Sequence, residues 1–78
     1  MPTILFRNGY RFFFYTNDHP PPHIHIEREN KTAKFNLEPV ALILSKRYNA
    51  KELSEIRKLV AENSTLFKTK WNEYFNNS

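Results

Sequence analysis

The amino-acid sequence predicts an α+β fold, in which a small antiparallel sheet of three to five strands has one or two C-terminal helices packed on one face. Two observations predict it. Short β-rich or alternating segments separated by turn residues fill about residues 3–44, and apolar residues at helical spacing fill about residues 50–75. With 78 residues, the chain has enough apolar area for one core. We therefore expect residues 1–78 to form a single domain.

The first two predicted strands flank the only glycine of the chain. Residues 3–6 are β-rich, residues 10–15 are mostly aromatic, and Asn8-Gly9 stands between them. Asn-Gly is typical of a two-residue hairpin turn, because such a turn needs positive φ angles that glycine adopts freely. We expect the aromatic side chains of the second strand to lie mainly in the core.

A proline-rich loop leads into the third predicted strand. Residues 20–22 are prolines, which neither continue a helix nor donate to a strand ladder, so residues 16–22 are expected to form a stiff, extended loop. Side chains alternate from His23 onward, which places His23, His25 and Glu27 on one face. The isoleucines between them, Ile24 and Ile26, should face the core.

Two more strands are predicted after a turn at residues 29–31. Residues 32–37 alternate again, and a hairpin would place Lys34 and Asn36 on the face that carries the histidines. The positions between them are apolar: Ala33, Phe35 and Leu37. Residues 40–44 form a short apolar run, which we also assign to a strand.

The helical part of the chain begins with a capping signal. Asn49 and Glu52 have the spacing of a capping box. Apolar residues then recur at helical period: Leu53, Ile56, Leu59, Val60, Leu66, Phe67, Trp71, Tyr74 and Phe75. Because Ser64 is a good N-cap residue, a break at Asn63-Ser64 is expected to divide the segment into two helices.

The composition excludes several classes of protein. The chain has no cysteine, which excludes a disulfide framework, a thiolate metal site and a cysteine nucleophile. It has no long apolar run and no signal-peptide pattern, so we expect a cytoplasmic protein that does not interact with a membrane. A net charge of +4 and a pI near 9.6 favour a polyanionic partner such as RNA, and they also fit an ordinary solvated surface.

All three histidines lie within residues 19–25. Imidazoles titrate near neutral pH, so one can take a proton from a 2′-hydroxyl while another protonates a leaving group, as in a metal-independent ribonuclease. Under this hypothesis His23, His25 and His19 are the candidate catalytic residues.

Basic residues supply candidate contacts to a phosphate backbone. Lys34 and Arg11 would stabilise charge on the reacting phosphate. Lys46-Arg47 forms a small basic cluster just before the predicted helix, and it would anchor a second phosphate. Acid–base chemistry of this kind requires no cofactor.

Two other interpretations of the histidines stay open. His23 and His25 on one strand face, with His19 on the preceding loop, match a three-imidazole zinc site with an open position for water. The strand histidines also match ordinary, half-exposed residues. The rigid prolines favour a functional site, because they hold His19 and His23 in a fixed relation with little entropy left to lose.

Residues 18–25 read Asp-His-x-Pro-Pro-His-x-His, a block too specific to expect by chance in so short a chain. Through this block the sequence resembles the bacterial family catalogued as domain of unknown function 4160. The other matching pieces are Met1-Pro2-Thr3-Ile4, residues 9–15, Ile26, Ala33-Lys34-Phe35, Leu37, Glu52-Leu53, Ile56, Glu62-Asn63 and residues 71–75. The sequence departs from the family at Tyr48-Asn49, where many relatives have a Gly-containing turn.

This resemblance implies a function only in outline, because the family is uncharacterised. Its members are commonly encoded beside a second small protein, often of the family domain of unknown function 2442, in pairs that look like toxin–antitoxin modules. The resemblance therefore implies a toxin-like component with a small cognate protein encoded nearby. It marks His19, His23 and His25 as motif positions and assigns them no role.

Our leading hypothesis is a toxin-like protein that binds RNA through the histidine face and, if the imidazoles are catalytic, cleaves it. The first alternative is a non-enzymatic protein-interaction module, an antitoxin or adaptor. The second is a histidine metal-binding protein with zinc on His19, His23 and His25. A chain this short can also gain stability by forming a homo-oligomer.

Overall fold

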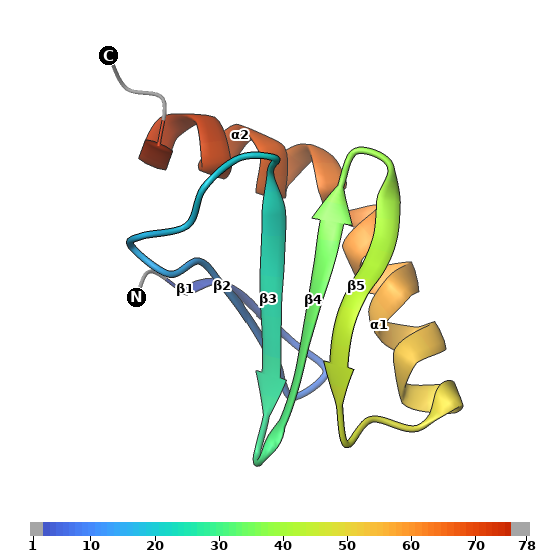
Figure 1. Ribbon diagram of the computed structural model, residues 1–78. Helices are drawn as coiled ribbons and strands as arrows, with labels where there is room; N and C mark the ends of the chain where they lie inside the picture. Colours follow the sequence, from blue (N-terminus) through green and yellow to red (C-terminus); the bar gives the residue numbers. More distant parts are fainter. Residues whose placement is uncertain (1–2, 76–78) are drawn as a thin grey trace.

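A computed structural model describes residues 3–75 and shows a five-stranded antiparallel sheet followed by two helices (Figure 1). The elements are β1 (Thr3–Arg7), β2 (Tyr10–Phe13), β3 (His23–Arg28), β4 (Lys31–Leu37), β5 (Val40–Lys46), α1 (Ala50–Glu62) and α2 (Ser64–Phe75). Neighbouring strands in the sheet are also neighbours in the sequence, so β1 and β5 are its edges. The predicted α+β class is confirmed. Met1 and Pro2, part of the family resemblance, lie outside the described residues.

The turn between β1 and β2 has the predicted form. Asn8 and Gly9 have φ angles of 57° and 81°, and they join Arg7 to its partner Tyr10. Two consecutive positive φ angles are the signature of a type I′ hairpin turn, whose twist matches that of the strands. β2 ends at Phe13, so the predicted strand was too long, and its last two residues, Phe14 and Tyr15, lie in the following loop.

The helices cover the face of the sheet that carries the alternate apolar residues. Ile24, Ile26 and Phe35 are fully buried in this core. Phe12 of β2 stacks on Phe67 of α2 with ring centroids 5.4 Å apart, and the ring of Phe14 meets Trp71 edge-on at 5.3 Å. Each such aromatic side chain removes a large apolar area from water, and burial of this kind contributes about 1.5–3 kcal/mol per side chain. The predicted alternation of β3 and β4 is confirmed.

The helical boundaries follow local capping chemistry. The backbone N–H of Glu52 donates to the Asn49 side chain at 2.8 Å, and the backbone N–H of Asn49 donates to the Glu52 carboxylate at 3.0 Å. This confirms the predicted capping box. The predicted break is also confirmed, although α2 begins at Ser64 itself, so Asn63 precedes the helix. Leu66 and Tyr74, expected in the apolar stripe, are exposed.

A charged network fastens α1 to one end of the sheet. The Glu52 carboxylate accepts hydrogen bonds from Arg28 of β3 at 2.9 Å and from Lys31 of β4 at 2.7 Å. The hydrogen bond from Lys31, then that from the Asn49 backbone, outweigh partial burial and lower the pKa of Glu52 to about 2. None of the helices within residues 3–75 is long and apolar enough to cross a membrane.

Candidate functional site

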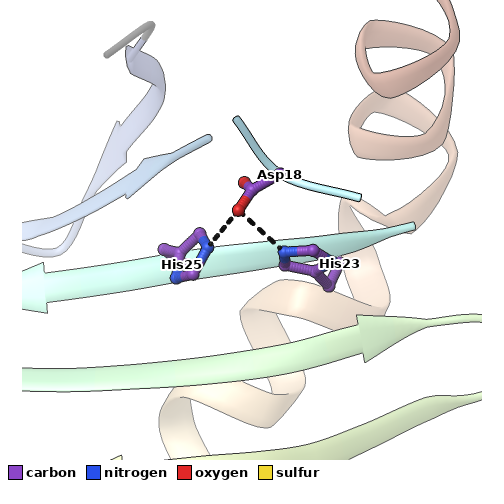
Figure 2. Close-up of side chains that lie close together, drawn as sticks. All are labelled: Asp18, His23 and His25. Carbon is purple, nitrogen blue, oxygen red and sulfur yellow. Dashed lines mark hydrogen bonds and ion pairs between the residues drawn. The ribbon is translucent and has the colours of Figure 1, made fainter. Parts of the chain in front are cut away.

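Two histidines of β3 converge on one aspartate of the preceding loop (Figure 2). His23 and His25 lie two residues apart on the strand and therefore project from the same face. The Nε2 atoms of both rings lie 3.2 Å from the same atom, Oδ1 of Asp18. One donor atom from each of these three residues lies within 4.8 Å of the other two. The side chains thus form a single cluster, which we call the Asp18–His23–His25 cluster.

Backbone hydrogen bonds hold Asp18 in place. The backbone N–H of Tyr15 donates to Oδ2 of Asp18 at 2.9 Å, and the N–H of Asp18 donates to the Tyr15 carbonyl at 3.2 Å. At the other end of the loop, the N–H of Leu37 in β4 donates to the carbonyl of Pro22 at 3.1 Å. Both ends of the loop are therefore attached to defined points, and Oδ1 of Asp18 is left free to face the histidines.

His23 is the most constrained member of the cluster. The residue is only 5% exposed, and its ring lies against Trp71 of α2 with the centroids 4.9 Å apart. Its Nδ1 lies 2.9 Å from the carbonyl oxygen of Pro21, which can only accept, so Nδ1 carries the hydrogen. Nε2 is buried without a hydrogen-bond partner, although Oδ1 of Asp18 lies only 3.2 Å away.

The tautomer of His23 has a consequence for the charge of the cluster. A neutral imidazole with its hydrogen on Nδ1 presents a lone pair at Nε2. This lone pair faces a carboxylate oxygen, which is also rich in electrons. Such an arrangement is unfavourable in a buried position unless a positive charge, either a proton or a metal ion, lies between the two atoms.

His25 lies between two aromatic rings. Its ring stacks on Phe13 at 5.5 Å and meets Tyr15 edge-on at 4.6 Å, and its side chain is 16% exposed. Burial lowers the pKa of His25, and the hydrogen bond with Asp18 opposes that shift only in part. His25 is therefore mainly neutral at pH 7, which is the form that binds metal ions.

Asp18 keeps its negative charge in this setting. Burial alone would raise the pKa of its carboxyl. The hydrogen bond from the Tyr15 backbone, followed by the hydrogen bond with His25, outweighs burial and lowers the pKa below its usual value. The cluster thus combines one carboxylate with two imidazole nitrogens.

Two open pockets adjoin the cluster, and Lys34 of β4 lines both of them. The larger, about 560 Å³, is lined by Asn17, Asp18, His19, Pro20, Pro21, His23, Lys34, Asn36 and Ile43. The smaller, about 340 Å³, is lined by Phe13, Tyr15, His25, Ile26, Thr32, Ala33, Lys34, Leu44 and Lys46. In the β3–β4 ladder, Lys34 is the partner of His25 and Asn36 is the partner of His23. The cluster is therefore reachable from solvent on this side of the sheet.

The structure separates the predicted site residues into those near the cluster and those away from it. His19 is exposed and lines the larger pocket, but it is not one of the three clustered groups. Arg11 forms an ion pair with Glu27 and donates to the Thr3 hydroxyl at 2.8 Å. Lys46 lines the smaller pocket. Arg47 is exposed in the loop before α1, with a φ angle of 74°.

Asp18 is the member of the cluster that sequence reasoning left without a role. The signal was present, because Asp18 opens the Asp-His-x-Pro-Pro-His-x-His block. The sequence-based hypotheses assigned roles to imidazole groups only, so they chose the adjacent His19. The loop brings the carboxylate of Asp18 onto the histidine face and leaves the side chain of His19 exposed.

The spacing of the cluster suits a metal ion. Zinc bonds of about 2.0–2.1 Å at tetrahedral angles put neighbouring ligand atoms roughly 3.3 Å apart. The two distances of 3.2 Å from Asp18 Oδ1 to the histidine nitrogens are close to this value, and all three ligand atoms lie within 4.8 Å of one another, so a single ion could bind them after a small inward shift of the rings. The hydrogen bond from His23 Nδ1 to a backbone carbonyl is the outer contact that usually orients a metal-binding histidine.

Comparison with known proteins gives one match. A family model described as "Domain of unknown function (DUF4160)" matches residues 9–72, which include all of the elements from β2 to α1 and the whole Asp18–His23–His25 cluster. Neither the curated proteins nor the solved structures contain a match to this chain.

Proposed function

This chain belongs to the DUF4160 family, and we propose that its function is to bind a divalent transition metal of the zinc class at Asp18, His23 and His25. One observation carries the proposal. His23 Nε2 is a buried nitrogen without a hydrogen-bond partner, and it points toward a carboxylate oxygen. A buried polar atom of this kind is rare in folded proteins and calls for an explanation such as a missing ion.

A metal ion explains the arrangement better than a proton does. A proton on His23 Nε2 would serve one contact, whereas an ion between the three donor atoms would satisfy both imidazoles and the carboxylate together. Imidazole and carboxylate ligands suit zinc, iron, cobalt and nickel, and the chain has no thiolate that would select a softer metal. Three protein ligands also leave a coordination position open toward the pockets. A bound ion there would act as a Lewis acid.

The test is metal binding by tag-free protein, followed by isothermal titration calorimetry with zinc and with cobalt. We expect one ion per chain, and we expect His23→Gln, His25→Gln and Asp18→Asn each to weaken binding by roughly tenfold or more. His19→Gln is the matched control, because it changes a neighbouring histidine outside the cluster, and its affinity should stay within about twofold of wild type. The proposal fails if zinc does not bind, or if all four variants behave alike.

A second candidate function is RNA binding, with cleavage by the histidines, as expected of a toxin-like protein. The observation that favours it is the smaller pocket, which brings His25, Lys34 and Lys46 together beside Tyr15, an exposed aromatic ring. Cations beside a stacking ring are what single-stranded RNA requires. In this proposal one of His23 and His25 takes the proton from a 2′-hydroxyl as that oxygen attacks the phosphate, and the other protonates the leaving oxygen. His19 assists from the rim, and Arg11 and Arg47 contact the RNA backbone farther away.

Salt dependence tests the RNA candidate. Affinity for a single-stranded RNA should fall linearly with the logarithm of salt between about 50 and 200 mM, and Lys34→Ala should reduce that slope by roughly one. Absence of RNA binding at the lowest salt would contradict it.

The interaction-module alternative has its own supporting feature. Leu42, Ile43 and Leu44 are exposed on β5, an edge strand. Exposed apolar edges are common places for another chain to pair. Recovery of a stoichiometric small protein encoded nearby, by pull-down from the native host, would support this alternative. If Ile43→Lys no longer recovers this partner protein, the binding surface lies on β5.

A further inference from the structure

Lys34 places a positive charge beside the Asp18–His23–His25 cluster. Lys34 stands opposite His25 in the β3–β4 ladder and lines both pockets beside the cluster. Among residues 3–75, Lys34 takes part in no ion pair. The larger pocket therefore holds one cationic side chain, Lys34, and one carboxylate, Asp18, whereas Lys34 and Lys46 share the smaller pocket with no carboxylate.

Binding of a divalent ion would give the cluster and Lys34 together an excess of positive charge. Asp18 is the only carboxylate in the cluster, and the histidines bind metal in their neutral form. One carboxylate cannot neutralise a doubly charged ion, and the Lys34 ammonium adds to the excess. A site with this charge pattern favours an anionic ligand that reaches both the ion and the ammonium group.

The larger pocket has the size and the donors for such a ligand. Its volume of about 560 Å³ lies in the range of small-molecule sites, and its rim includes the amides of Asn17 and Asn36 and the ring of His19. These side chains can donate hydrogen bonds to oxygen atoms that the two cations do not reach.

We propose that this pocket binds the phosphate group of a phosphate ester, with one oxygen on the metal ion and another on the Lys34 ammonium. The proposal rests on the metal site proposed above. A phosphate group offers two or more oxygens that share its negative charge and point in different directions, so it can bridge two separate cations. A carboxylate can also bridge two cations, but it has only two oxygens in one plane, so it offers fewer directions for contact than the tetrahedral phosphate group.

The phosphate group could belong to a monoester or to a diester such as an RNA backbone, and the experiment separates these sources. Cobalt-loaded protein is titrated with phenyl phosphate, with dimethyl phosphate and with a ten-nucleotide single-stranded RNA. Benzoate serves as the carboxylate counterpart of phenyl phosphate. Binding is followed by calorimetry and by the visible absorption of cobalt, which changes when a ligand enters its coordination shell.

We expect at least one phosphate ester to bind more tightly than benzoate, by roughly five- to tenfold, and to change the cobalt spectrum. Lys34→Met should weaken this binding by roughly five- to tenfold, and Lys34→Arg should restore most of it. The matched control is Lys58→Met, which removes the same charge from an exposed position of α1 in a separate surface hollow.

The outcomes separate this inference from the metal site on which it rests. Intact cobalt binding with no phosphate binding, or equal losses in Lys34→Met and Lys58→Met, overturns the phosphate inference and leaves the metal site standing. Absence of cobalt binding overturns both. Preference for phenyl phosphate would identify a monoester site, and preference for dimethyl phosphate and RNA would identify a diester site.

Discussion

Replacement of His23 by leucine should separate the stability of the fold from the chemistry of the site. His23 is 5% exposed and its Nε2 has no hydrogen-bond partner. A buried polar atom left unpaired costs roughly 1–3 kcal/mol, and His23→Leu removes that cost. The substitution also removes the hydrogen bond from Nδ1 to the Pro21 carbonyl, which is worth about 0.5–1.5 kcal/mol. Leucine still packs against Trp71, so we expect a net gain of about 1 kcal/mol in the metal-free protein.

Zinc should reverse this order. At a zinc concentration of 100 times Kd, binding adds about 2.7 kcal/mol to the free energy of unfolding of wild type. The variant lacks a ligand and should gain little. In a domain of this size, 1 kcal/mol corresponds to roughly 4–8 °C in Tm. His23→Leu should therefore melt above wild type in the presence of a chelator and below it in zinc.

Thermal unfolding followed by circular dichroism, with chelator and with zinc, measures both effects. His19→Leu is the control, because that side chain is exposed and lies outside the cluster. Its Tm should follow wild type in both conditions. The reasoning would be refuted if His23→Leu lost more than about 1 kcal/mol in chelator, since His23 would then be a structural residue, or if zinc stabilised variant and wild type equally.

Three further predictions concern the fold. The pKa of Glu52 in the folded protein is about 2, below its ordinary 4.5, so its stabilising contribution is present above about pH 4.5 and is lost as the pH falls toward 2. Glu52→Gln should therefore reduce the fall of the free energy of unfolding with pH in this range, and the exposed Glu73→Gln should not. Phe67→Ala should cost about 3–5 kcal/mol in urea unfolding because it empties a fully buried position, whereas Leu66→Ala, on the exposed side of the helix, should cost far less. Glu29→Gly should raise the free energy of unfolding by about 0.5–1 kcal/mol, since Glu29 has a φ of 57° that glycine adopts without strain; an unchanged or lower free energy of unfolding would contradict this.

Most of the fold could be predicted because it follows from local patterns. The Asn8-Gly9 turn, the alternation of histidines with isoleucines in β3, and the capping box at Asn49 each depend on residues a few positions apart. The same reasoning extended the apolar stripe of α2 too far. Tyr74 has helical spacing but is exposed, and only one side of its ring meets the neighbouring rings of Phe14 and Phe75.

The candidate site was predicted only in part, because it depends on the path of a loop. The shared face of His23 and His25 follows from strand geometry. The approach of Asp18 depends on the backbone hydrogen bonds with Tyr15 and on the course of the prolines, which no periodicity describes. The burial of His23 depends on Trp71, a residue far away in the sequence that α2 brings against the ring.

The contact between His23 and Trp71 makes the protein its own optical reporter. Trp71 is the only tryptophan in the chain, and its ring centroid lies 4.9 Å from that of His23. Tryptophan fluorescence therefore reports on one position, next to the ring of His23 that carries the unpaired Nε2. Any species that enters the cluster changes the electric field at this ring, and an ion with unfilled d orbitals would quench its emission. Occupancy of the site can thus be followed in unlabelled protein, at concentrations far below those that calorimetry needs.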